Sequence, residues 1–138
     1  MKKLLAFAMS AVLFAGAFTG CANGGGFDTA SDITVITREE GSGTRGAFIE
    51  LFGVEEKDAD GNKVDKTIST ADTQTSTGVV LTSVEQNVNA IGYISLGSLD
   101  DSVKAVKIDG AEASAENVSN GSYKVSRPFN IATKGTPN

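Results

Sequence analysis

The chain has 138 residues, one cysteine, no histidine and a formal net charge of −5 at pH 7. Without histidine, a Ser-His-Asp or Cys-His catalytic arrangement and a histidine metal ligand are excluded. The acidic balance and the lack of a basic run also argue against a nucleic-acid partner, because such proteins use lysine and arginine to neutralise a phosphate backbone.

Residues 1–20 have the organisation of a bacterial lipoprotein signal peptide. A short basic start precedes an almost wholly apolar stretch over residues 4–18, and small residues stand immediately before Cys21. We expect cleavage before Cys21 and attachment of a lipid to its thiol, which would anchor the protein to the bacterial cell membrane on its extracytoplasmic side. A retained transmembrane helix is the weaker alternative, because the apolar stretch is shorter than the roughly 20 residues that span a bilayer.

Cys21 is the only cysteine and therefore cannot form an internal disulfide. Lipid attachment accounts for it, and a free surface thiol is the alternative. Residues 21–30, with three consecutive glycines, are predicted to form a flexible tether, and residues 31–138 a single folded unit. Removal of residues 1–20 would also remove Lys2 and Lys3 and make the chain more acidic.

A strand, a loop rich in small residues and a helix are predicted at the start of this unit. Residues 33–37 are mainly apolar and predict a strand, and residues 44–52 place apolar side chains on one side of a helix that ends at Gly53. The loop contains Gly41-Ser42-Gly43-Thr44. Its main-chain N–H groups can converge on one point, because glycine permits close approach and the first turn of a helix has unpaired donors. A tetrahedral oxyanion fits such a site.

Four residues are the candidate anion contacts, namely Arg38, Ser42, Gly43 and Thr44. Arg38, at the end of the predicted strand, offers a planar fork of donors to two oxygens of the anion, and the two hydroxyls can orient toward the others. The alternative is that Ser42 or Thr44 only caps the helix.

The charged neighbours of this loop are interpreted separately. Arg45 is expected either to reinforce the anion site electrostatically or to point to solvent from the first helical turn. Glu39 and Glu40 are interpreted as a solvated charged turn, since nothing marks them as an acid/base pair. Enzyme function and a cofactor are therefore not predicted.

The middle of the chain begins with a turn region, or a hairpin, over residues 57–66. Its alternating acids suggest calcium, but the register is wrong, because Gly61 precedes Asn62 and no glutamate follows at the bidentate position. A tight turn is favoured and no metal is predicted.

A second helix is predicted to begin at a Ser76 cap and to run through about Asn87, with Val80, Val84 and Val88 as its core stripe. Its start, Thr75-Ser76-Thr77-Gly78, either lines the same cleft as the first loop or only caps the helix. Strands are predicted over residues 90–96, 103–108 and 127–133. The alternation of helices and strands favours an α/β layer fold.

The first loop also carries a family resemblance. The segment Thr37-Arg38-Glu39-Glu40-Gly41-Ser42-Gly43-Thr44-Arg45-Gly46-Ala47-Phe48 resembles the phosphate-binding loop of the substrate-binding proteins that feed ABC-type phosphate importers. Residues 90–95, 103–110 and 123–130 follow in the order and approximate spacing of such proteins, so the resemblance covers roughly residues 32–134. It implies a single lobe of a type II periplasmic-binding-protein-like fold, with a β-sheet flanked by helices and residues 127–129 in a structural role.

The resemblance implies a function as well. The protein would be an extracytoplasmic lipoprotein that binds inorganic phosphate through Arg38, Ser42, Gly43 and Thr44 and delivers it to the permease subunits of an ABC importer. In this family a second lobe contributes a further serine- and threonine-rich loop and an aspartate that accepts the proton of hydrogen phosphate. No counterpart of that lobe is visible in the sequence, so we expect a second chain to supply it and this chain alone to bind weakly.

Two alternatives remain open at this stage. The chain could be a surface lipoprotein outside transport, or a shortened remnant, that uses the domain for protein contact. It could also bind another tetrahedral oxyanion, such as sulfate, because the aspartate that would discriminate against sulfate is not visible.

Overall fold

The computed structural model describes residues 29–128, 130 and 132–135, and its centre is a parallel sheet of three strands. The strands lie in the order β4-β1-β5, with β1 (Thr34–Arg38) between β4 (Asp72–Gln74) and β5 (Ala90–Ile91). Valine, isoleucine and threonine dominate β1, as is typical of a strand packed on both faces. The predicted signal peptide, Cys21 and nearly all of the tether lie outside the described residues.

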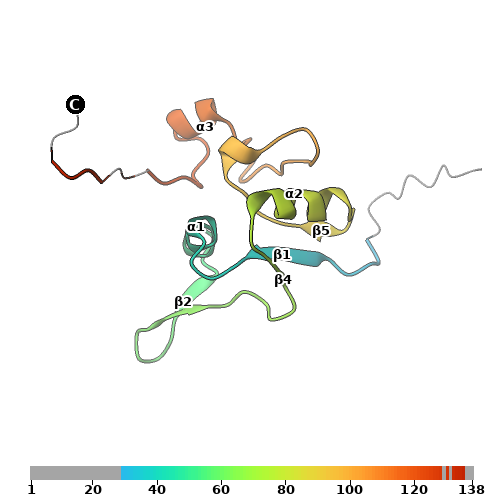
Figure 1. Cartoon of the computed structure of the whole chain (residues 1–138), viewed down its shortest axis with the longest axis horizontal. Helices are drawn as coiled ribbons and strands as arrows, with labels where there is room; N and C mark the ends of the chain where they lie inside the picture. Colours follow the sequence, from blue (N-terminus) through green and yellow to red (C-terminus); the bar gives the residue numbers. More distant parts are fainter. Residues whose placement is uncertain (1–28, 129, 131, 136–138) are drawn as a thin grey trace, which may run out of the picture.

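Two helices follow the carboxyl ends of the parallel strands (Figure 1). Helix α1 (Gly43–Leu51) follows β1, and α2 (Thr77–Glu85) follows β4 and packs against all three strands. Because the strands are parallel, the loops that open both helices lie at the same edge of the sheet. The alternating α/β pattern predicted from the sequence is confirmed in this part of the chain.

The core lies between α2 and the sheet and is small. Ile36 on β1 and Val80 on α2 are 3% and 2% exposed, and Ile49 on α1 is the other buried apolar residue in the described part of the chain. Gly92 lets the helix come close, because a Cβ at this position would lie 3.0 Å from Val80 Cγ1 and 3.3 Å from Val84 Cγ2. At such distances a side chain at this position would require the neighbouring valine side chains to move.

The segment between α1 and β4 forms a separate hairpin. Strands β2 (Glu55–Lys57) and β3 (Lys63–Asp65) pair antiparallel. In the turn, Gly61 has a positive φ of 85°, and the Asp58 carboxylate accepts main-chain N–H bonds of 2.8–2.9 Å. The hairpin interpretation is confirmed, and the turn itself satisfies the carboxylate that had suggested calcium.

The second half of the chain contains less regular structure than predicted. Strand β5 covers only two of residues 90–96, and residues 103–108 contain no strand, although Ile108 forms an isolated bridge with Ala111. The described residues of 127–133 are also not in a strand. A strand needs a neighbour to pair with, and within the described residues no strand lies beyond β5. Instead the segment forms a 3₁₀ turn, η1 (Leu96–Ser98), and a short helix, α3 (Ala115–Ser119).

The apolar faces of the helices were only partly predicted. Ser76 caps α2 and Val80 is buried as expected, but Val88 is 57% exposed because the helix ends before it. In α1 the buried side chain is Ile49, whereas Leu51 is exposed. The periodicity identified both helices and the buried Val80, but the predicted apolar side of α1, formed by Ala47, Phe48, Leu51 and Phe52, did not include the buried Ile49.

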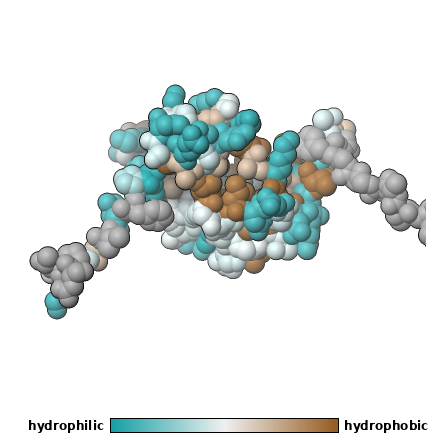
Figure 2. Space-filling model, turned by 90° about the horizontal axis from the view of Figure 1, so that it is seen from above, coloured by the Kyte–Doolittle hydropathy of each residue, from teal (hydrophilic) through white to brown (hydrophobic). Residues whose placement is uncertain are grey.

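Several large apolar side chains lie at the surface, and Figure 2 shows hydrophobic residues gathered on one face between hydrophilic groups. Ile33 and Ile91 are 58% and 50% exposed. Val35 and Ile91 are register partners on β1 and β5, and Ile33 lies two residues before Val35, so these side chains share one face of the sheet. Among the described helices, none combines the length and hydrophobicity needed to cross a membrane.

Candidate anion-binding site

Arg38 lies at the carboxyl end of β1, where the starts of α1 and α2 meet. Its Nη1 donates to the hydroxyl of Thr77 at 3.2 Å, which joins positions 39 residues apart in the sequence. The side chain of Arg38 is only 12% exposed. The start of α2 therefore lies beside the guanidinium, as expected if both helix starts line one site.

Glu39 occupies the other edge of the same guanidinium. Arg38 Nε and Nη2 each donate to a carboxylate oxygen of Glu39 at 2.9 Å, which is a bidentate pair. This bond raises the pKa of Arg38 above its ordinary value and lowers the pKa of Glu39. The interpretation of Glu39 as part of a solvated turn is wrong, because the turn folds its carboxylate onto Arg38, whereas Glu40 is exposed as predicted.

Ser42 is the N-cap of α1. Its Oγ accepts the main-chain N–H of Arg45 at 3.4 Å, and Gly41 before it has a φ of 84°, a conformation that favours glycine. Ser42 therefore caps the helix. Capping uses the hydroxyl as an acceptor, so its own hydrogen can still be donated to an anion.

Gly43 and Thr44 form the first turn of α1. Helix geometry gives their main-chain N–H groups no carbonyl partner within the helix, so they are available as donors at the positive end of the helix dipole. The hydroxyl of Thr44 lies 3.2 Å from that of Ser95, which follows β5. Ser95 was not singled out from the sequence, although it ends one of the segments that carry the family resemblance.

Arg45 does not point freely to solvent, which was one of its two predicted roles. Its Nε and Nη2 donate to Asp65 Oδ2 at 3.0 and 2.7 Å, and its Nη1 donates to the main-chain carbonyl of Arg38 at 2.8 Å. Burial alone would raise the pKa of Asp65, but hydrogen bonds from Thr67 and Arg45 outweigh it and hold the pKa below its ordinary value. The side chain of Arg45 is therefore held by other groups of the protein.

Tyr93 supports the same strand end from the β5 side. Its hydroxyl lies 2.7 Å from Thr37 Oγ1 and accepts the main-chain N–H of Arg38 at 3.2 Å, and its ring stacks on Phe48 with centroids 4.1 Å apart. Its role was not predicted, because the contact with Arg38 spans 55 residues. Tyr93 fixes β1 and α1 relative to each other.

Arg127 connects the end of the described chain to the loop. Its Nη2 donates to the carbonyl of Gly43 at 2.8 Å. The family resemblance implied a structural role for residues 127–129, of which Phe129 lies outside the described residues. The Arg127 contact holds the carbonyl of the first helical residue, beside the donors of Gly43 and Thr44.

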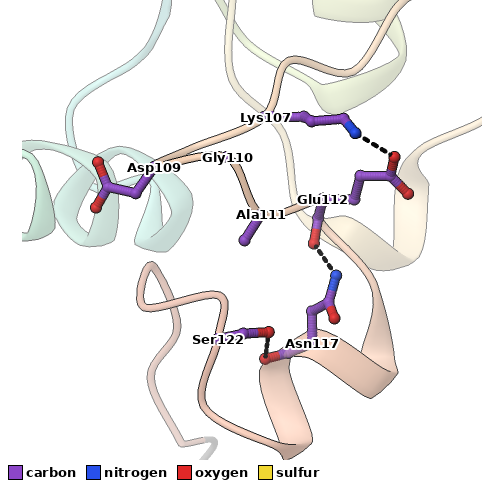
Figure 3. A pocket seen from close by; sticks show the side chains of 7 residues that line it. All are labelled: Lys107, Asp109, Gly110, Ala111, Glu112, Asn117 and Ser122. Carbon is purple, nitrogen blue, oxygen red and sulfur yellow. Dashed lines mark hydrogen bonds and ion pairs between the residues drawn. The ribbon is translucent and has the colours of Figure 1, made fainter.

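A cavity of about 430 Å³ lies elsewhere, over residues 107–122 (Figure 3). Several of its polar groups are paired: Lys107 Nζ lies 2.8 Å from a Glu112 carboxylate oxygen, and Asn117 Nδ2 donates to the Glu112 carbonyl at 3.0 Å. None of the four predicted anion contacts lines it. Throughout the described part of the chain, no group of three acidic or cysteine side chains is placed to hold a metal ion.

A parallel sheet whose carboxyl edge carries an arginine and two capped helix starts defines an α/β lobe of the periplasmic-binding-protein type. No family model matches the chain. Phosphate-binding protein PstS 2 of Streptococcus agalactiae, however, is 51% identical over 133 residues, which is 96% of this chain and 45% of that protein. The chain is similar to this phosphate-binding protein over nearly its whole length and spans less than half of the relative's length.

Solved structures agree with this relationship. A phosphate-binding protein of a phosphate ABC transporter from Streptococcus pneumoniae is 57% identical, with a TM-score of 0.64, and the match covers 67% of this chain and 36% of that chain. A Clostridium perfringens protein assigned as a phosphate ABC transporter substrate-binding protein, solved with bound phosphate, is 48% identical with a TM-score of 0.60. That match covers 70% of this chain and 37% of the other.

Proposed function

We propose that this chain binds inorganic phosphate for an ABC-type phosphate import system, with Arg38, Ser42, Gly43 and Thr44 as its anion contacts. The observation that carries the proposal is the position of Arg38, whose guanidinium lies at the carboxyl edge of the sheet beside the first turn of α2 and next to the loop that opens α1. The names of the similar proteins support phosphate as the anion.

The site supports binding by charge and hydrogen bonds. A tetrahedral anion can accept from the fork of Arg38, from the hydroxyls of Ser42 and Thr44 and from the N–H groups at the start of α1. Glu39 and Thr77 use three of the five N–H groups of Arg38, so one N–H on each Nη remains for the anion, beside the Glu39 carboxylate. We propose no chemical conversion of the phosphate, since its contacts would be donors that hold it rather than groups that attack it.

The proposed partners follow from this role. Permease subunits of the importer would receive the phosphate, and a lipid on Cys21 would hold the protein at the extracytoplasmic face of the cell membrane. We also propose a second chain that supplies the other lobe of the phosphate site. The small core and the exposed Ile33 and Ile91 support such a partner, because a lobe that packs beside another exposes apolar surface when alone.

The direct test is an amide NMR titration of residues 22–138, which lack Cys21, with phosphate and then sulfate at fixed ionic strength. Dispersed peaks and saturable phosphate shifts around residues 38–44 are expected, with weaker shifts for sulfate. Dispersed peaks that do not shift when phosphate is added would contradict the proposal and favour a protein-contact role. Stronger binding of sulfate would contradict phosphate as the ligand.

Glu39→Gln is expected to tighten phosphate binding by roughly threefold to tenfold. The change removes a negative charge beside the anion and frees the Nε and Nη2 donors of Arg38 at little steric cost. The dissociation constant at low and at physiological salt measures the effect, which should shrink as salt screens it. Glu40→Gln is the matched control, since Glu40 is exposed in the same turn, and an equal gain there would show that Glu39 does not compete.

A further inference from the structure

Arg38 is the register partner of Gln74 on β4, but its own N–H and C=O bond to side chains instead of to a strand. The N–H of Glu39 donates to Gln74 on β4, so the N–H and C=O of Arg38 point the other way, toward β5. Pairing of β1 with β5 ends at Val35 and Ile91. Beyond that point Tyr93 accepts the Arg38 N–H, and Arg45 donates to the Arg38 carbonyl.

Arg45 in turn is fixed by the β2–β3 hairpin. Two of its nitrogens donate to Oδ2 of Asp65 at the end of β3, and the other carboxylate oxygen accepts from the main-chain N–H and the hydroxyl of Thr67 at 2.8 and 2.6 Å. The side chains of Arg45 and Asp65 are 18% and 25% exposed. A half-buried pair with these additional hydrogen bonds holds its geometry better than an exposed ion pair.

We propose that Arg45 and Asp65 are positioning residues for the anion site. Together they fix the Arg38 carbonyl. This fixes the direction of the Arg38 side chain at the end of β1 and the start of the Gly41–Thr44 loop. This inference rests on the proposed phosphate binding. Within this inference Arg45 acts by position, because each of its three nitrogens donates inside the protein, to Asp65 or to the Arg38 carbonyl. Supporting residues of this kind decide how well a site holds its productive geometry.

The hairpin thereby acquires a function in the site. It has its own two-stranded sheet, and Lys63 and Glu55 form an ion pair of 2.6 Å that stays inside it. The Arg45–Asp65 contact ties β3 to the end of β1. The Lys63–Glu55 pair lies within the hairpin, whereas the Arg45–Asp65 pair connects the hairpin to α1, so substitutions can remove the two pairs separately.

The experiment compares Arg45→Gln, Asp65→Asn and their combination with Lys63→Gln, all in the full-length chain in detergent micelles. Equilibrium dialysis with labelled phosphate gives the dissociation constant, thermal unfolding gives the stability, and amide NMR follows residues 38–44. Arg45→Gln and Asp65→Asn should each weaken phosphate binding about tenfold, as the loss of a supporting partner does at other built sites. The double variant should be little worse than either single one, because both remove the same contact.

Lys63→Gln is the matched control and should leave the dissociation constant within about twofold, even where it lowers the melting temperature as much as Arg45→Gln does. Arg45→Lys should recover part of the affinity, since lysine keeps the charge and can reach only some of the partners. Unchanged phosphate binding in Arg45→Gln, or equal weakening in Lys63→Gln, would overturn the positioning role.

The two hypotheses can fail separately. If the unaltered chain does not bind phosphate, the proposed function fails, and the amide shifts and hydrogen exchange of residues 38–42 then decide the inference. Changes there in Arg45→Gln and Asp65→Asn but not in Lys63→Gln would support it. Unchanged signals in all three variants would overturn it.

Discussion

Replacing Arg38 by alanine is expected to weaken phosphate binding at least about a hundredfold. Hydrogen bonds to a charged group contribute roughly 1.5–3 kcal/mol each, and two such bonds from one guanidinium correspond to about two orders of magnitude or more in affinity. The Arg38 side chain is 12% exposed, so water screens these bonds less than it would at the surface. The loss also leaves Glu39 without its partner, and an unpaired carboxylate beside the site repels the anion further.

Two further variants define what Arg38 contributes. Arg38→Lys keeps the charge but loses the planar fork, so an intermediate loss of roughly tenfold is expected. Lys104→Ala removes one exposed cation away from the site and should leave the dissociation constant nearly unchanged. Titration calorimetry measures the phosphate dissociation constants of Arg38→Ala, Arg38→Lys and Lys104→Ala, and circular dichroism checks that each variant is folded. An Arg38→Ala protein that binds phosphate as the unaltered chain does would exclude this loop as the site.

The sequence predicted the part of the fold that local signals determine. Residues 33–37 are mainly apolar, with little alternation between apolar and polar side chains. Ser42 and Gly53 flank the first helix, and Ser76 caps the start of the second. Each of these signals acts within a few residues, so a single sequence is sufficient to recognise it. The same holds for the loop that brings the glycines, hydroxyls and Arg38 into one short segment.

Contacts between distant residues were not predictable in the same way. Arg45 and Asp65 are 20 residues apart, and Arg38 and Tyr93 are 55 apart. A lone arginine in a first helical turn and a lone aspartate at a strand end give no sign that they meet, since that depends on where the hairpin lies. Glu39 was misjudged for a related reason, because the geometry of the turn decides whether a neighbouring acid points to solvent or folds back onto Arg38.

The wrong strand predictions have a different physical cause. Residues 103–108 contain valines and an isoleucine in a pattern typical of a strand, yet Val106 is 58% exposed and no strand of the described chain pairs with the segment. Strand propensity reflects packing against neighbours more than an intrinsic preference of the backbone. The pattern therefore predicts a strand only where the rest of the fold supplies a partner.

Ile36→Ala is expected to remove a large share of the stability of the chain. Ile36 is 3% exposed at the centre of β1, and it meets Val80 in a core with few other buried apolar side chains. Truncation of such a residue costs about 2–5 kcal/mol, which is a large share of the roughly 5–15 kcal/mol that stabilises a typical domain. Urea unfolding followed by circular dichroism measures the loss as a lower midpoint with an unchanged slope.

Ile33→Ala is the matched control, because it makes the same chemical change one residue before the same strand, at a position that is 58% exposed. Its cost should stay within about 0.5 kcal/mol, as for most surface substitutions. An equal cost at both positions would contradict the small core described above. If the proposed second chain covers this face of the sheet, its addition should raise the cost at Ile33 and leave the cost at Ile36 nearly unchanged, because only Ile33 would gain a new apolar contact.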